Sequence, residues 1–206
     1  MNQKNIKLSI IIALFIFTCI TCINPVYAEY QLLQHLGTLF VSFILFIDLK
    51  KNKLSLFAFS FVAIFIILHV IGARWIYSFV PYNNFFDNYF SLNINEVFDL
   101  GKRNHYDRLV HFAFGGLFLP FLFEGFFHKY KNKILALLLA WLSLQCFSMV
   151  YEVFEWLLTV YSDKIGEDYN GQQGDNFDAQ KDMALAMMGS NIVVLFYLFK
   201  KDKSYT

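Results

Sequence analysis

Charged residues are scarce in this sequence, at 16% of the chain against roughly a quarter in soluble domains. The charges leave a formal net charge of +1, so no basic surplus indicates nucleic acid as a partner. Cysteines number three, and Cys19, Cys22 and Cys146 lie in apolar stretches without histidines at zinc-ligand spacing. We therefore interpret the three cysteines as ordinary apolar residues, and we expect no binding to nucleic acid.

Hydrophobic residues are abundant, at 57% of the chain, and they occur in long blocks. Each block has about the 17–25 residues that a helix needs to cross a bilayer. The blocks run over residues 6–23, 31–48, 54–71, 106–127, 134–158 and 183–199. This pattern predicts an all-α fold, a polytopic membrane bundle of about six transmembrane helices. Internal repeats, low-complexity tracts and a separate soluble domain are not visible.

Lysine clusters indicate the orientation of these helices. They lie before the first block, after the second, after the fourth and after the sixth, which are alternate ends of one consistent path. By the positive-inside rule, both termini lie in the cytoplasm and the connections 72–105 and 161–181 lie outside. We expect a multi-pass protein of the bacterial cytoplasmic (inner) membrane, with a cytoplasmic C-terminus and membrane lipids around it.

The first block allows two interpretations. Lys4 and Lys7 precede an apolar stretch, and residues 24–28 end in Ala28, which has the form of a secretory signal peptide with its cleavage site. Cleavage would leave five transmembrane helices. Residues 1–28 are therefore either a transmembrane helix or a signal peptide, and residues 29–206 form the transmembrane domain.

Ionisable residues within or beside the apolar blocks are the candidate functional residues, because charges in hydrocarbon are costly and commonly mark a site. Asp107 and His111 are four residues apart and Glu152 and Glu155 are three apart, so each pair shares one helix face. The other candidates are His69, Arg74, Asp175, Asp178 and Asp182. The predicted topology brings all of them to the outer ends of their helices.

Carboxylates packed this closely repel one another and need a cation, a shared proton or a basic partner. Oxygen ligands with an imidazole suit a divalent metal such as Mg, Mn, Zn or Fe. The expected metal ligands are His111, Glu152, Glu155, Asp178 and Asp182. The expected supporting or substrate-binding residues are His69, Arg74, Arg103, Asp107, Arg108 and Asp175, the arginines through bidentate contacts to an anionic head group. Asp107 and Asp175 also suit helix N-caps, and His69 also suits a structural polar contact.

Four segments resemble the YjdF-like bacterial inner-membrane proteins. These segments are 103–112, 151–156, 173–183 and 69–81, and the resemblance covers about residues 30–200. Phe177 stands where that family is expected to have Trp. The family has no known function, so the resemblance implies the membrane fold and the choice of site residues but no reaction.

A more distant similarity links Asp107-Arg-Leu-Val-His-Phe112 to VanZ-like membrane proteins. In that comparison Glu152, Glu155, Asp178 and Asp182 correspond to later acidic positions. The similarity implies a role in the cell envelope, in handling lipid or glycopeptide ligands.

Three functions remain open from the sequence. The first is a metal-dependent membrane enzyme acting on an envelope lipid, although neither a Gly-x-Ser-x-Gly nucleophile motif nor an arginine-rich phosphatase signature is present. The second is an ion- or proton-coupled transporter that uses the same acids and histidine. The third is a non-enzymatic envelope scaffold in which the polar cluster is structural.

Overall fold

The computed structural model describes residues 2–161 and 173–199, and all regular structure in these residues is helical. The helices are α1 (Gln3–Thr21), α2 (Ala28–Lys51), α3 (Leu56–Arg74), α4 (Tyr82–Phe90), α5 (Ile94–Val97), α6 (Tyr106–Tyr130), α7 (Lys133–Tyr161) and α9 (Asp178–Phe199). Six of them, all except α4 and α5, are long and apolar enough to cross a membrane. The predicted polytopic helical bundle is confirmed.

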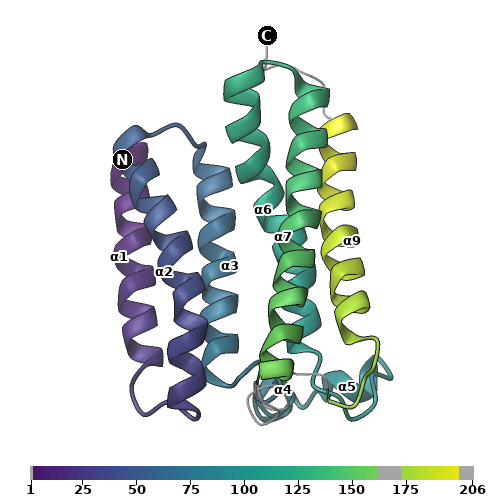
Figure 1. Cartoon of the computed structure of the whole chain (residues 1–206). Coiled ribbons are helices and arrows are strands. Elements are labelled where there is room, and N and C mark those ends of the chain that lie inside the picture. Colours follow the sequence, from purple (N-terminus) through teal and green to yellow (C-terminus); the bar gives the residue numbers. More distant parts are fainter. Residues whose placement is uncertain (1, 162–172, 200–206) are drawn as a thin grey trace.

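The long helices form two groups of three that lie side by side (Figure 1). The first group is α1, α2 and α3, and the second is α6, α7 and α9. Contacts between α3 and α6 join the groups, and α6 also packs against α7 and α9. The short helices α4 and α5 lie at the end where α3 stops and α6 begins (Figure 1).

The two ends of the bundle differ in chemistry. One end holds the lysines at the start of α1, around the α2–α3 connection and around the α6–α7 connection, and we call it the lysine-rich end. The other holds α4, α5 and the ionisable residues that open α6 and α9, and we call it the carboxylate end. Three of the four lysine clusters therefore lie at one end, as predicted, and the fourth, at residues 200–203, lies outside the described residues.

Large apolar side chains are exposed on the flanks of the long helices. Leu32 on α2 is 74% exposed and Phe40 is 67% exposed, whereas Phe59 and Phe123 in the interior are fully buried. Exposing apolar side chains costs free energy in water but not in the hydrocarbon core of a bilayer. The surface therefore fits helices that span a membrane.

Two glycines let α6 and α9 approach closely. A Cβ atom on Gly115 would lie 1.9 Å from the backbone oxygen of Ala186, and one on Gly189 would lie 2.1 Å from that of Phe112. Real Cβ atoms do not come this close, so neither position has room for a side chain. The close contact at Gly115 and Gly189 brings the first turns of the two helices together.

A buried ion pair ties α1 to α2 at the lysine-rich end. Lys7 Nζ donates to Asp48 Oδ2 over 2.6 Å and to the carbonyl oxygen of Leu54 over 2.7 Å. Asp48 Oδ1 accepts the backbone N–H groups of Lys53 and Leu54, so its carboxylate is fully paired. The α2–α3 connection is thus fixed by a charge that α1 supplies.

The segment before α6 is held by hydrogen bonds to Asn95 and Tyr82. The Asn95 side chain donates to the carbonyl oxygens of Gly101 and Arg103, and Tyr82 donates to Asn95 Oδ1. The hydroxyl of Tyr82 accepts the backbone N–H of His105. These contacts set where α6 begins and where Arg103 lies.

Candidate functional site

Four buried ionisable side chains from three helices meet at the carboxylate end. Asp107 and His111 come from the first two turns of α6, Glu152 from near the end of α7 and Asp182 from the second turn of α9. His111 Nε2 lies 3.6 Å from Asp107 Oδ1, and His111 Nδ1 lies 3.5 Å from Glu152 Oε1. Asp107, His111 and Asp182 each offer a ligand atom, and these atoms lie within 4.8 Å of one another. We call the four residues the inner cluster.

Helix geometry explains why these residues meet. Asp107 and His111 are one turn apart on the face of α6 that continues to Gly115. Asp182 is likewise one turn before Ala186, whose backbone packs against Gly115. The close contact of α6 with α9 therefore places the carboxyl group of Asp182 beside the imidazole of His111.

Two oxygen atoms of the inner cluster have no hydrogen-bond partner among the described residues. They are Glu152 Oε1 and Asp182 Oδ1, and both are buried. A buried acceptor without a donor is costly, and a buried carboxylate without a counter-charge is more so. The cluster has three carboxyl groups and one imidazole, so it can accept a cation or protons.

Glu155 lies one helical turn beyond Glu152, at the edge of the inner cluster. Its side chain accepts a hydrogen bond from Tyr151 and interacts electrostatically with Asp107, Glu152 and His111. It is only partly buried, unlike Glu152. Of the five predicted metal ligands, the structure thus groups His111, Glu152 and Asp182, with Glu155 next to them.

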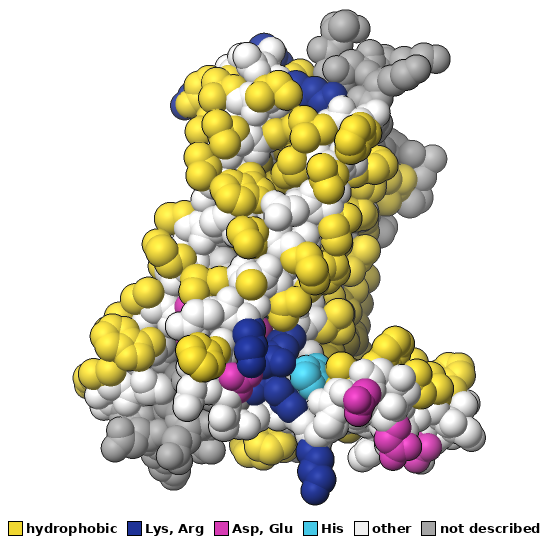
Figure 2. Space-filling view, turned by 90° about the vertical axis from the view of Figure 1, so that its right-hand side faces the viewer, with side chains coloured by type: hydrophobic (Ala, Val, Ile, Leu, Met, Phe, Trp, Pro, Cys, Tyr) yellow, Lys and Arg dark blue, Asp and Glu magenta, His cyan; other side chains and the backbone are white. Residues whose placement is uncertain are grey.

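Asp178, the fifth predicted ligand, lies in a separate ionic network. Arg103 donates to Asp178 Oδ1 over 2.5 Å, and Arg108 donates to Asp175 Oδ2 over 2.5 Å and to Asp178 Oδ1 over 3.4 Å. Lys181 donates to Asp175 over 2.6 Å. We call these five residues the outer network. Figure 2 shows basic (blue) and acidic (magenta) side chains gathered near the carboxylate end, below a largely hydrophobic surface.

Asp175 precedes α9 and lies outside the membrane-spanning segment. The ammonium group of Lys181, the backbone N–H of Phe177 and the guanidinium of Arg108 all donate to its carboxylate and hold its pKa well below the usual range. Asp175 is therefore a carboxylate at any ordinary pH, and its role is to join the start of α9 to α6.

His69 and Arg74 lie apart from the inner cluster. His69 Nε2 donates to the carbonyl oxygen of Gln34 over 3.1 Å, and the hydroxyl of Tyr77 donates to His69 Nδ1. Arg74 donates to the carbonyl oxygens of Thr21, Ile23 and Asn24, which close the α1–α2 connection. The contacts of Arg74 are structural, and those of His69 fix its imidazole as the Nε2–H tautomer.

A cavity of about 560 Å³ opens beside the inner cluster, between α2 and α3 on one side and α6 and α7 on the other. We call it the membrane cavity. Its polar wall includes His69, Tyr77, Asp107, His111 and Tyr151. Most of its remaining lining is apolar and includes Phe65, Phe114, Phe118 and Phe147, and it extends as far as Ile44 and Phe121. Its size lies within the usual range for small-molecule sites, roughly 300–1,000 Å³.

Two residues near this site, Ser148 and Tyr77, are not among the site residues predicted from the sequence. Ser148 is buried on α7 one turn before Glu152, and its hydroxyl has no hydrogen-bond partner among the described residues. Its i, i+4 spacing to Glu152 is a signal that could identify it. Tyr77 offers no such signal, because it lies in the connection after α3 with a positive φ of 53°.

Comparisons with known proteins agree with the fold. A family model described as "Predicted membrane protein (DUF2238)" matches residues 6–203. The chain is 28% identical over 153 residues to a protein of Escherichia coli (strain K12) described as "Inner membrane protein YjdF", a match that covers 71% of this chain and 67% of the relative. No solved structure is significantly similar to the chain.

Proposed function

The chain belongs to the DUF2238 family of predicted membrane proteins, and we propose that it binds a divalent cation at the inner cluster and uses it on an envelope lipid. The proposed orientation places the lysine-rich end in the cytoplasm, in line with the positive-inside rule. The inner cluster then faces the outer side of the membrane.

The observation that carries the proposal is the convergence of three buried ligand atoms, from Asp107, His111 and Asp182, within 4.8 Å of one another. Glu152 adds a fourth group, 3.5 Å from His111. Carboxylate oxygens with a single imidazole are the donor set of Mn, Fe, Zn or Mg sites. A dication would compensate the carboxylates of Asp107 and Asp182 and provide a partner for the unpaired Asp182 Oδ1.

The pairing within the outer network supports a cation as the counter-charge of the inner cluster. The guanidinium groups of Arg103 and Arg108 are paired with Asp178 and Asp175, so their charge is already compensated. No Lys or Arg forms an ion pair with the inner cluster among the described residues. We assign Arg103 and Arg108 to the positioning of α9 against α6. The head group of a lipid would have to compete with Asp175 and Asp178 to bind these arginines.

The membrane cavity supports a lipid as the substrate. Its mostly apolar walls suit hydrocarbon, while Asp107 and His111 lie on its polar side. A lipid whose chain lies along Phe114 and Phe118 would present its polar group to the inner cluster. The bound cation would then polarise an ester or phosphoryl oxygen of that group.

Glu152 is the group we assign as general base. In hydrolysis, the oxygen of a water molecule would bond to the acyl or phosphoryl centre, and its proton would pass to Glu152. The bond to the leaving oxygen would break, and that oxygen would take up the same proton from Glu152, which returns the carboxylate to its starting state. Glu152 Oε1 is suited to this role because it is buried and has no donor among the described residues.

Metal analysis of the full-length protein, purified in mild detergent and incubated with Mn, Zn, Fe or Mg, tests the proposal. We expect about one tightly bound ion per chain, lost in His111→Ala and Asp182→Asn. Asp175→Asn is the matched control, since it removes a nearby carboxylate that lies outside the inner cluster, and it should retain the metal. Absence of a bound divalent ion in the unmodified protein would refute a metal site.

A second measurement separates an enzyme from a transporter or a structural cluster. Lipid profiles of cells that lack the protein should show accumulation of one envelope lipid, and the unmodified gene should reverse it whereas a Glu152→Gln variant should not. Unchanged profiles with intact metal binding would contradict the enzymatic part alone. The mostly apolar lining of the membrane cavity favours an enzyme over an ion-coupled transporter.

A further inference from the structure

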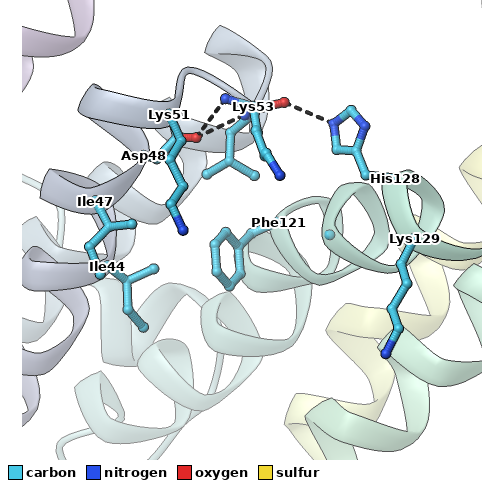
Figure 3. Close-up of a pocket in the computed structure, with 10 residues that line it drawn as sticks. Ile44, Ile47, Asp48, Lys51, Lys53, Phe121, His128 and Lys129 are labelled. Carbon is cyan, nitrogen blue, oxygen red and sulfur yellow. Dashed lines mark hydrogen bonds between the residues drawn. The ribbon is translucent and has the colours of Figure 1, made fainter.

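A second cavity, of about 450 Å³, opens at the lysine-rich end between α2 and α6. We call it the basic pocket. Ile44, Ile47 and Phe121 form apolar parts of its wall, and Lys51, Lys53, His128 and Lys129 are its basic residues. Figure 3 shows Lys51 and Lys53 coming from the α2 side and His128 and Lys129 from α6, with Phe121 between them. The basic pocket is separate from the inner cluster.

The charge of the basic pocket is uncompensated. Its one acidic residue, Asp48, is already paired with Lys7 and with the backbone N–H groups of Lys53 and Leu54. The ammonium groups of Lys51, Lys53 and Lys129 are exposed and form no ion pair with any residue that the structure describes. Three lysines around one opening therefore present a positive field to an anionic ligand.

The architecture of the opening is also fixed. His128 Nε2 donates to the carbonyl oxygen of Lys53 over 2.9 Å, which joins the end of α6 to the α2–α3 connection. Glu124 on α6 accepts the backbone N–H of Ser55 over 2.7 Å at the start of α3. The two sides of the pocket are thus tied together at its rim, as expected for a preformed site.

We propose that the basic pocket binds an anionic phospholipid of the leaflet at the lysine-rich end, with its phosphate between Lys51, Lys53 and Lys129 and a hydrocarbon chain against Ile47 and Phe121. Charge complementarity favours this occupant, since the basic rim matches a phosphate and the apolar wall matches an acyl chain. Basic pockets between transmembrane helices commonly bind such head groups. Inorganic phosphate would contact the lysines but would gain no binding energy from the apolar residues of the pocket.

Native mass spectrometry of the full-length protein with phosphatidylglycerol and phosphatidylcholine tests this site. We expect phosphatidylglycerol to bind more tightly, by about fivefold for each lysine that contacts it. The variant Lys51→Gln/Lys53→Gln/Lys129→Gln should lose the preference. The matched variant Lys4→Gln/Lys50→Gln/Lys131→Gln removes the same charge from the same end but from residues that do not line the pocket, and it should keep the preference.

Gly125 provides a test that changes no charge. It lines the basic pocket, and a Cβ atom placed on it would meet no atom within 4 Å. Gly125→Leu should therefore fold normally while its side chain occupies the space of the lipid, and binding of phosphatidylglycerol should fall several-fold. Retained binding in Gly125→Leu, or equal loss in the two lysine variants, would overturn the proposal.

Inorganic phosphate distinguishes the two sources of the same chemistry. Millimolar phosphate should displace phosphatidylglycerol only weakly, because the lipid also gains from its buried chain. Full displacement by phosphate at the concentration of the lipid, or equal binding of phosphatidylcholine, would overturn the assignment to an anionic lipid. Neither outcome bears on the metal site, which is measured by metal content.

Discussion

Lys7 of α1 and Asp48 of α2 form a salt bridge of 2.6 Å from which solvent is excluded, with the lysine side chain 0% exposed. Removing one partner of a buried pair leaves an uncompensated charge and commonly costs about 3–5 kcal/mol. We expect Lys7→Met to lower the thermal unfolding temperature in detergent clearly, and Lys7→Met/Asp48→Leu to recover part of the loss. Equal stability of the unmodified protein and Lys7→Met would contradict this role.

The same salt bridge bears on the fate of the first helix. Cleavage after Ala28 would remove Lys7 and leave Asp48 buried without its cation, and it would separate Arg74 from the carbonyl oxygens of Thr21 and Ile23. We therefore propose that α1 is retained as a transmembrane helix. The intact mass of protein purified from membranes should include residues 1–28. A mass lacking residues 1–28 would contradict retention.

Gly115 should tolerate no side chain. Its Cβ would meet a backbone oxygen at 1.9 Å, which no rotamer change relieves. We expect Gly115→Ala to force α6 and α9 apart and to lower the free energy of unfolding by about 1–3 kcal/mol, as overpacking does. We also expect it to weaken metal binding at the inner cluster. Gly116→Ala is the control, because its Cβ would lie 3.6 Å from the nearest atom. Equal effects of both substitutions would argue against the close contact.

Asp175 gives a pH dependence whose sign follows from its lowered pKa. A carboxyl group with a lowered folded-state pKa contributes stability that is present above its unfolded pKa, about 3.9, and is lost as the pH falls toward the folded value. Unmodified protein should therefore unfold at a higher temperature than Asp175→Asn at pH 7 and pH 5. That difference should shrink below about pH 4. A difference that grows on acidification would contradict the assignment.

Filling the membrane cavity should block a lipid without disturbing the metal. Gly37 lines the cavity, and a Cβ there would lie 3.8 Å from His69 Nε2, an ordinary contact. We expect Gly37→Leu to reduce the amount of lipid that co-purifies with the protein and to slow turnover, with metal content unchanged. Loss of metal in Gly37→Leu would show that the two parts of the site are not separable.

The sequence predicts well where the helices lie and which of their faces are polar. It predicts poorly which side chains of neighbouring helices contact one another. Long apolar blocks place the spans, and the spacing of Asp107 and His111 gives one face of α6. The same local rules cannot show that Asp178 turns toward Arg103 while Asp182 turns toward His111, because that depends on how α9 is rotated against α6 at Gly115. The contacts of Arg74 with backbone carbonyl oxygens cannot be predicted from the pattern of residue types, because every residue has a carbonyl group.

The walls of the two cavities share Ile44 and Phe121. A hydrocarbon chain entering from either end of the bundle would therefore reach toward the same space, and two long chains would compete for it. Occupancy of the basic pocket by a phospholipid should weaken binding of a lipid in the membrane cavity, and by thermodynamic reciprocity the reverse should hold to the same degree. The content of anionic lipid in one leaflet would then tune chemistry that takes place at the other.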